Sequence, residues 1–467
     1  MGEGKGIVPG EPYVLSIDYP DEAPRSATVM NFGTWTHHGF ATGFANPDCY
    51  WPEYVHTAHE SYALPLSNEI RTFHEVMFPL EQCQQVETAQ KDGAAVYDLP
   101  SEGFDVAFAL FSKDRQPDSL GVAVKAIRLY RIDDYAAAKP EIHYPLGGAP
   151  RRHVTFREEM GDSYMLQGHK DDKASAYRDK ARLMSLLGVD TTSRDLLEFG
   201  YLQYWDSSYS EGRYGHSDGY SRWGSASDYW TDTVRYMAEE GHYLLPYYEY
   251  AGGRGPSGWG NQGQKPVTLR AGNGGFSNQS WINSSLADVT EEGTYDDFRY
   301  LLDMTLLRYS SRPEYADRFL GAWIRNRFQL PMGFSDRAIA KFNADRGYAT
   351  TRLEMYAALT NEQTRIQNAG GTADWTCKEQ WGPQVYRDYR EWWFLKRRDF
   401  FAAMRDYLAT NGLPAARLFY HPTQAEPGEQ WDGWSPPNSV FSPDETCLWN
   451  GTDWKSFTAV WFITAIS

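Results

Sequence analysis

The pattern of apolar and polar positions changes character near residue 150. Before that point, short apolar runs are broken at close intervals by Gly, Pro, Asp and Asn, which is typical of strands joined by turns. These runs predict an all-β domain over residues 1–150, folded as a sandwich or jelly roll. Residues 139–152 read as a linker. The predicted strands are YVLSIDY, SATVMNF, EVMFPL, AAVYDL, DVAFALF and AVKAIRLYRI.

From about residue 170, strand-like and helix-like segments alternate. Near-continuous apolar strands that alternate with helices indicate a parallel sheet. Gly188, Gly241 and Gly412 are the expected C-terminal stops of three of the helices. The predicted helices are DKASAYRDKARLMSLLG, SDYWTDTVRYMAEEG, TYDDFRYLLDMTLLRY, FSDRAIAKFNAD and YRDYREWWFLKRRDFFAAMRDYLATNG. The predicted strands are LLEFGYLQYWDSS, HYLLPYYEYAGG, WINSSLADVTEE, DRFLGAWIRNR, AARLFYH and KSFTAVWFITAIS.

The alternation and the length together predict a (β/α)8 TIM-type barrel over residues 151–467. Only about six strands are recognisable before the last residue, so a barrel that is incomplete at its C-terminus stays open as an alternative. A doubly wound sheet is the other alternative. It lacks its usual signal, because no predicted strand is followed by GxGxxG or a P-loop.

Polar, acidic and aromatic residues recur where the predicted strands end. In a barrel of this kind, ligands bind at the carboxyl ends of the strands. Some of these residues have structural alternatives. Asp288 can cap the next helix, and either Arg325 or Arg327 can form an ion pair with an acid at a strand end. The candidate ligand-binding residues are Trp205, Asp206, His216, Asp218, Trp223, Trp259, Asp288, Arg325, Asn326, Arg327, His421 and Trp431.

Two glutamates stand out among the strand-end acids. Glu249 directly follows an apolar strand. Glu426 lies in the loop HPTQAEPGEQWDGW, where Pro427 and Gly428 hold the backbone in a tight turn that aims the side chain. Glycoside hydrolysis needs two carboxyl groups across the scissile bond, roughly 5 Å apart for retention and 6.5–9.5 Å apart for inversion. Glu249 and Glu426 are therefore the candidate catalytic pair.

Composition narrows the class of ligand. The chain contains 17 Trp, 32 Tyr and 23 Phe, an aromatic fraction of 15%. Aromatic rings are used to stack flat ligand faces, although large aromatic cores account for part of this fraction. The net charge of −17 repels polyanions, so nucleic acid and acidic lipid surfaces are not expected as partners. A neutral sugar is not penalised by this charge.

Other chemistries leave no signal in the sequence. The 4 Cys residues form no CxxC pair, and neither HExxH nor GxSxG occurs, so no metal, cofactor or serine nucleophile is expected. No window has the roughly 18 apolar residues of a membrane span. The N-terminus lacks the apolar core of a signal peptide. The protein is therefore expected in the cytoplasm, or outside it if a signal was removed. The oligomeric state is not indicated.

A segment around the fourth predicted strand resembles a known family. FLGAWIRNRFQLPMGFSDRAIAKFNADRGY, followed by YREWWFLKRRDFF, is similar to barrel glycoside hydrolases of the β-galactosidase and agarase type. The resemblance covers residues 190–430 and implies a barrel preceded by an accessory β-sandwich. In that family a Glu follows the strand-four Asn as the acid/base. Here Asn326 is followed by Arg327, so the resemblance carries over Asn326 as a substrate-binding position but not the acid/base.

The sequence thus predicts a carbohydrate-active protein, and it leaves three hypotheses. The first is a glycosidase that uses Glu249 and Glu426. The second is a non-catalytic carbohydrate-binding protein on the same scaffold, motivated by the missing Asn-Glu pair. The third is a polysaccharide lyase, in which Tyr, His and Arg side chains would abstract the proton. The sugar, the linkage and the stereochemistry are not specified by the sequence.

Overall fold

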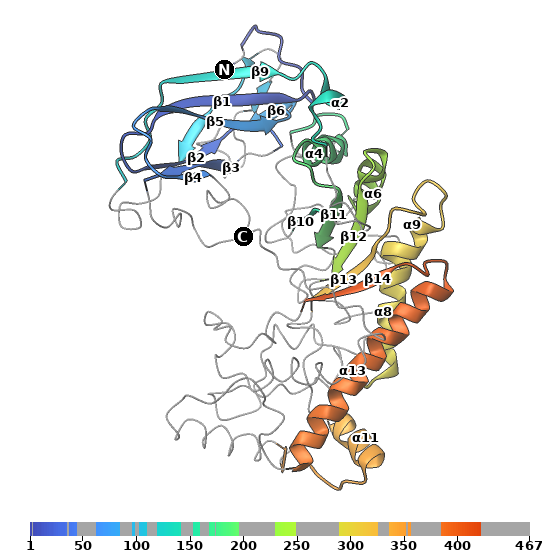
Figure 1. Ribbon diagram of the computed structural model, residues 1–467. Helices are drawn as coiled ribbons and strands as arrows, with labels where there is room; N and C mark the ends of the chain where they lie inside the picture. Colours follow the sequence, from blue (N-terminus) through green and yellow to red (C-terminus); the bar gives the residue numbers. More distant parts are fainter. Residues whose placement is uncertain are drawn as a thin grey trace, which may run out of the picture.

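Figure 1 shows the chain in a computed structural model, with strands of the N-terminal part above a second group of strands and helices. The structure describes residues 1, 3–34, 37–43, 62–84, 96–98, 102–109, 119–141, 153–158, 168–172, 174–195, 229–248, 289–325, 336–351, 354–355 and 384–421. Two of the predicted strands, over 196–208 and 455–467, lie outside these residues, as does most of the strand predicted over 281–292.

The N-terminal part contains two main sheets, which we call the two-sheet unit. One sheet has the order β5-β1-β9 and the other has the order β4-β3-β2-β8. β1 pairs antiparallel with both of its neighbours, and Ile17 lies opposite Phe73 on one side and Ile127 on the other. The strands are β1 (Tyr13–Pro20), β2 (Arg25–Met30), β3 (His37–Thr42), β4 (Tyr62–Leu64), β5 (Ile70–Met77), β8 (Ala107–Ala109) and β9 (Ala126–Arg131), with a further antiparallel pair, β6 (Gln82–Gln84) and β7 (Val96–Asp98).

The two main sheets share one apolar core. Side chains alternate between the faces of a strand, so Leu15 and Ile17 of β1 point into the same core as Val29 of β2 and Phe40 of β3. All four side chains are fully buried. The ring of Tyr19 stacks on that of Phe40 at 4.0 Å between centroids. The apolar positions predicted from the sequence are therefore the ones that hold the two sheets together.

The second part of the chain is built around a five-stranded parallel sheet with the order β10-β11-β12-β13-β14. Among the described strands, neighbours in the sheet are also consecutive in the sequence, and every pair is parallel. This sequential order is the one that a (β/α)8 barrel requires, but closure into a barrel stays a prediction. The strands are β10 (Thr155–Glu158), β11 (Thr191–Asp195), β12 (Tyr243–Tyr248), β13 (Gly321–Arg325) and β14 (Arg417–His421).

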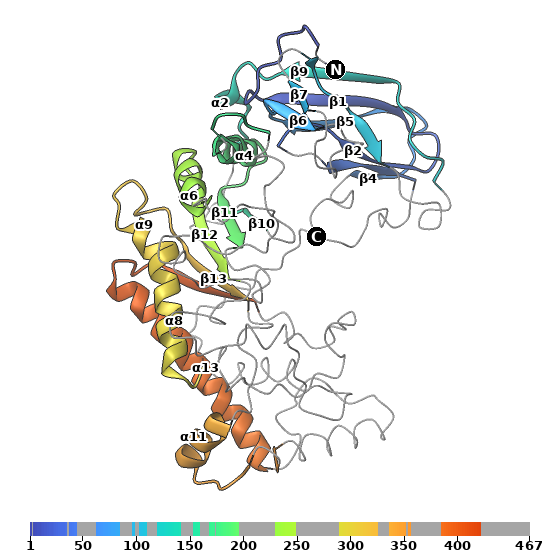
Figure 2. The same ribbon diagram turned by 180° about the vertical axis from the view of Figure 1, so that it is seen from behind.

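The described helices that follow β10 lie to one side of this sheet, as Figures 1 and 2 show from opposite directions, and a short helix, α2 (Tyr135–Ala138), lies beside the N-terminal strands. Leu244, Ala322 and Leu418 of three neighbouring strands point into one large core with side chains from these helices. Each of the five predicted helices is present within the described residues, and the one over 294–309 contains a π-helical turn. The helices are α4 (Ser175–Leu186), α6 (Tyr229–Glu239), α8 (Glu292–Leu302), η4 (Asp303–Leu307), α9 (Arg308–Ser310), α11 (Asp336–Arg346) and α13 (Gln384–Thr410).

Glycines end the helices where the sequence predicts. Gly188, Gly241 and Gly412 have φ values of 76°, 87° and 98°. A residue with a side chain rarely adopts this left-handed conformation, so glycine is the usual residue just after a helix. The turn after α6 leads within three residues into β12, which fixes how that helix returns onto the sheet.

Two strands of the parallel sheet, β10 and β11, were not predicted. β11 reads TTSRD, which lacks an apolar run, yet Thr191, Thr192, Ser193 and Arg194 are at most 1% exposed. The strand predicted next in the sequence, LLEFGYLQYWDSS, lies outside the described residues. The strand predicted over 281–292 is not confirmed at its end, because residues 289–291 form a turn that leads into α8. β12 pairs directly with β13.

Candidate functional site

The carboxyl ends of β12, β13 and β14 lie side by side in the parallel sheet. Tyr248 is the register partner of Ile324, and Arg325 is the register partner of His421. Arg325 and His421, which the sequence placed at two different strand ends, are thus brought to one edge as neighbours. This edge, which we call the carboxyl edge, is where a parallel sheet builds a ligand site.

The face of the sheet opposite the described helices carries an aromatic cluster. Tyr247, Trp323 and Phe419 pack together with Leu245, and each is at most 8% exposed. The rings of Tyr247 and Trp323 meet edge to face, with centroids 4.9 Å apart. Because these residues alternate with the helix-facing Leu244, Ala322 and Leu418, the two faces of the sheet are both lined with buried apolar groups.

The other candidate residues follow these strands in the sequence. Glu249 comes directly after Tyr248, and Asn326 and Arg327 come directly after Arg325. The structure describes the strand ends but not these positions. The candidates outside the described residues are Trp205, Asp206, His216, Asp218, Trp223, Glu249, Trp259, Asp288, Asn326, Arg327, Glu426 and Trp431.

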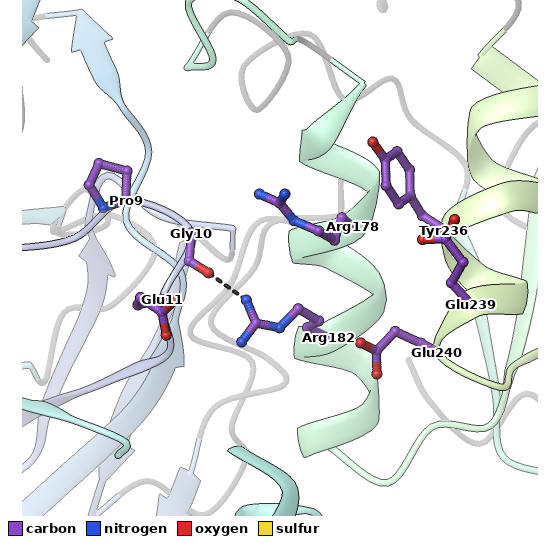
Figure 3. Close-up of a pocket in the computed structure, with 8 residues that line it drawn as sticks. All are labelled: Pro9, Gly10, Glu11, Arg178, Arg182, Tyr236, Glu239 and Glu240. Carbon is purple, nitrogen blue, oxygen red and sulfur yellow. Dashed lines mark hydrogen bonds between the residues drawn. The ribbon is translucent and has the colours of Figure 1, made fainter. Parts of the chain in front are cut away.

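A cavity of about 330 Å³ lies between the two-sheet unit and the helices of the parallel sheet. Figure 3 shows its walls: a turn before β1, the α4 side chains and the C-terminal end of α6. We call it the junction cavity. Its lining residues are Pro9, Gly10, Glu11, Arg178, Arg182, Tyr236, Glu239 and Glu240.

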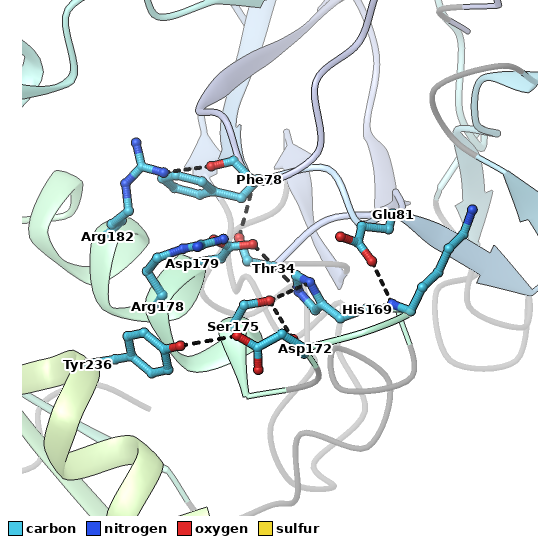
Figure 4. A network of polar contacts seen from close by, with 12 residues as sticks. Thr34, Phe78, Glu81, His169, Asp172, Ser175, Arg178, Asp179, Arg182 and Tyr236 are labelled. Atoms are coloured by element: carbon cyan, nitrogen blue, oxygen red, sulfur yellow. Dashed lines mark hydrogen bonds and ion pairs between the residues drawn. The ribbon is translucent and has the colours of Figure 1, made fainter.

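A buried polar network lies beside this cavity, on the inner side of α4 (Figure 4). The Oγ atom of Ser175 is 2.8 Å from Nδ1 of His169, and Nε2 of His169 is 3.5 Å from Oδ2 of Asp179. Ser175 also bonds to the carbonyl oxygen of Asp172 at 2.7 Å. The segment that carries His169 is tied to the two-sheet unit, because Gly168 accepts a hydrogen bond from the amide of Gln82 at 3.0 Å.

Ser175, His169 and Asp179 are the residue types of a serine hydrolase triad, but the two ring nitrogens of His169 are exchanged relative to that triad and the setting is different. His169 is 2% exposed, Asp179 is 0% exposed and Ser175 is 6% exposed. A nucleophile must reach a substrate carbonyl, and a hydroxyl at the buried start of α4 does not. The network therefore joins α4 to the segment before it, and we assign it no nucleophilic role.

Burial shifts the pKa values of Asp179 and His169 in opposite directions. Burial raises the pKa of Asp179 to about 6, and the neighbouring Arg178 only partly opposes this. Burial lowers the pKa of His169 from its ordinary value. One feature of the sequence could have revealed the network: Asp179 occupies a core-facing position of α4, where helical spacing predicts an apolar residue.

The described residues offer no group of three or more His, Cys, Asp and Glu side chains placed to hold a metal ion. In the same part of the chain, no helix is long and apolar enough to cross a membrane.

Comparisons with known proteins give a limited picture. No protein-family model matches the chain, and no curated protein matches it in sequence. Among solved structures, it is similar to a β-galactosidase from the psychrophilic Marinomonas ef1, with 10% identity, a TM-score of 0.30, and coverage of 57% of this chain and 36% of that one. The chain thus spans about a third of the length of that enzyme.

A second similar structure is the catalytic domain of a β-amylase from Paenibacillus polymyxa. It also has 10% identity and a TM-score of 0.30, over 62% of this chain and 72% of that one. Both proteins are glycoside hydrolases, and the likeness to each is loose. It does not establish a family for this chain.

Proposed function

We propose that the protein is a glycoside hydrolase that cleaves a poly- or oligosaccharide at the carboxyl edge of its parallel sheet. In this proposal residues 151–467 form a (β/α)8 barrel, and residues 1–150 form an accessory β-sandwich. The observation that carries the proposal is the strand order β12-β13-β14, in which all three strands are parallel and adjacent. It supports a shared site for the residues that follow these strands.

The spacing of strands supports the choice of catalytic pair. Glu249 follows β12 and Glu426 lies five positions after the last residue of β14. Neighbouring strands are about 4.8 Å apart, so the ends of β12 and β14 are separated by roughly 10 Å, with β13 between them. Two carboxyl groups that reach inward from these ends are suited to flank a glycosidic bond.

The remaining candidates have roles that follow from their chemistry. One glutamic acid protonates the leaving oxygen, and the other carboxylate attacks the anomeric carbon or activates water. Charged and amide side chains bind sugar hydroxyls: Asp206, His216, Asp218, Asp288, Arg325, Asn326, Arg327 and His421. Indole rings stack on the apolar faces of sugar rings: Trp205, Trp223, Trp259 and Trp431.

The test is a screen of the purified protein on polysaccharides and aryl glycosides, with Glu249→Gln and Glu426→Gln beside it. We expect turnover by the parent, and a loss of at least about 100-fold in each variant, because the amide cannot exchange a proton or act as a nucleophile. Binding should be retained. Glu292→Gln, an exposed acid at the start of α8, is the matched control and should keep full activity.

Three other outcomes would overturn the proposal in distinct ways. Turnover by both variants would move the chemistry to another strand end. Binding without turnover by the parent would identify a non-catalytic carbohydrate-binding protein. A product that absorbs in the ultraviolet would identify a lyase, because elimination leaves an unsaturated sugar.

A further inference from the structure

The junction cavity lies away from the carboxyl edge. α6 contributes Tyr236, Glu239 and Glu240 near its C-terminal end. The chain then turns at Gly241 and enters β12 at Tyr243, so these residues lie toward the amino end of the strand. A ligand in the junction cavity would therefore lie at the opposite end of the strand from the carboxyl edge. With about 330 Å³, the cavity is at the lower limit of ligand pockets and fits a single small molecule.

The inner wall of the cavity is held rigidly. Arg182 donates from Nη1 to the carbonyl oxygen of Gly10 at 2.6 Å, and its guanidinium lies 5.0 Å from the ring centroid of Phe78 and 4.6 Å from that of Tyr135. Glu240 accepts from the Tyr135 hydroxyl and from Lys139, each at 2.8 Å. A ligand would find these groups already ordered, and this lowers the entropic cost of binding.

Gly10 leaves room for this arrangement. Its φ of 74° is in the left-handed region, and a Cβ atom there would come within 3.3 Å of Nη2 of Arg178. The turn before β1 can therefore approach α4 closely without a side chain between them. The outer groups of the cavity are more accessible: Arg178, Glu11 and Glu239 are exposed.

The charges of the lining nearly cancel. Two guanidinium groups face three carboxylates in the lining; Lys139 is paired with one of these, Glu240, and Arg178 is paired with the buried Asp179 behind the lining. A balanced lining favours neither a phosphate nor a metal cation. It offers N–H donors and carboxylate acceptors within one small space, and a hydroxyl group is both a donor and an acceptor. The ring of Tyr236 and Pro9 add apolar surface.

We propose that the junction cavity is a second ligand site, which binds one neutral polyhydroxylated ring such as a monosaccharide unit. The choice of a sugar over another polyol rests on the proposed function; the location and the donor and acceptor chemistry do not. Because the lining comes from the two-sheet unit and from two helices of the parallel sheet, bound ligand contacts both parts of the molecule.

The test is ligand-observed NMR on the full chain with glucose, galactose and mannose, and with inorganic phosphate and glucuronate as charged comparators. We expect at least one neutral sugar to bind with a dissociation constant on the order of 1 mM. Arg178→Ala and Glu239→Ala should each weaken it about tenfold or more, because each removes a charged hydrogen-bonding partner. Glu292→Ala, on α8 and outside the cavity, should leave binding unchanged.

Glu239 is exposed, so Glu239→Ala remains informative if Arg178→Ala fails to fold. Binding of phosphate or glucuronate in place of neutral sugars would overturn the proposal, as would sugar binding that neither variant affects. The two proposals fail separately. Glu249→Gln should abolish turnover and keep the junction site, whereas Glu239→Ala should lose the junction site and keep turnover of a small aryl glycoside.

Discussion

The two ends of the parallel sheet use polar residues differently. At the amino end, His242 lies 2.8 Å from Oγ of Ser185 and 3.3 Å from Oγ1 of Thr192, and Arg318 donates to the carbonyl oxygen of Gly241 at 2.8 Å. These groups bind neighbours within the protein. At the carboxyl edge, the register brings Arg325 beside His421, and acids follow the strands in the sequence. In our proposal, the first end holds the sheet together and the second end binds ligand.

The largest effect on stability is expected at Gly321, at the amino end of β13. Its φ is 145°, and a Cβ atom would lie 1.7 Å from the carbonyl oxygen of Arg417 in β14. Gly321→Ala should therefore cost more than about 4 kcal/mol in the free energy of unfolding. Urea unfolding measures it, with Gly347→Ala as control. Gly347 also has a positive φ, of 73°, but nothing lies within 4 Å, so about 1 kcal/mol is expected there. Equal losses of stability in Gly321→Ala and Gly347→Ala would contradict a steric role for Gly321.

The next largest effect is a dependence of the free energy of unfolding on pH, which arises from His242. Burial lowers its pKa to about 4, against about 6.5 in the unfolded chain. The folded protein binds this proton less readily, so the contribution is fully present above pH 6.5 and is lost as the pH falls toward 4. The loss is about 3 kcal/mol at most. Urea unfolding between pH 4.5 and 7.5 should show this slope in the parent and not in His242→Gln. The exposed His74→Gln should keep it.

A smaller net effect is expected at the His169–Asp179 pair, because the two contributions oppose each other. The raised pKa of Asp179 gives stability below about pH 4 that is lost as the pH rises through about 6. The lowered pKa of His169 gives stability above about 6.5 that is lost at lower pH. The other charges that face the pair are Glu81, Asp172, Arg178 and Arg182.

Single substitutions should separate these contributions. In His169→Gln, stability should fall as the pH rises from 4.5 to 7, and in Asp179→Asn it should fall as the pH decreases over the same range. The change in His169→Gln, which reports on Asp179, should be up to about 3 kcal/mol over this range. The same unfolding series measures both, with the exposed Asp171→Asn as control. If stability changed with pH in the same direction in both variants, the opposed pKa shifts of His169 and Asp179 would be contradicted.

The smallest effect is expected in the helix layer that packs on the sheet. The indole nitrogen of Trp230 donates to the carbonyl oxygen of Thr305 at 2.8 Å, within the π-helical turn. Trp230→Phe keeps most of the buried ring and removes this hydrogen bond. It should cost about 1 to 2 kcal/mol in urea unfolding and should leave turnover unchanged. A loss of turnover without a loss of stability would place this layer in the chemistry.

Sequence patterns predicted the elements whose cause is local. Helical spacing identified α4, α6, α11 and α13, and three glycines marked helix ends. The apolar runs of β12, β13 and β14 were also recognised. β11 was missed because its residues are polar and its burial depends on neighbours distant in the sequence: Thr192 contacts the sulfur atoms of Met184 and Met237.

For the candidate site, the sequence predicted which residues follow each strand but not which strand ends are adjacent in space. Which ends are adjacent depends on strand order, and the sheet brings Arg325 and His421 together. The junction cavity could not be predicted, because its walls come from residues 9–11, α4 and α6, which are far apart in the sequence. The resemblance to barrel glycoside hydrolases pointed to the same edge through Asn326, which follows β13 directly.

One measurement tests the contrast between the two ends most directly. It is the rate of glycosidic cleavage, with the free energy of unfolding, in Glu249→Gln and His242→Gln. The account predicts that Glu249→Gln loses at least about 100-fold in turnover with unchanged stability, and that His242→Gln keeps turnover and changes only in stability. Full turnover in Glu249→Gln, or a loss explained entirely by unfolding, would contradict a catalytic carboxyl edge.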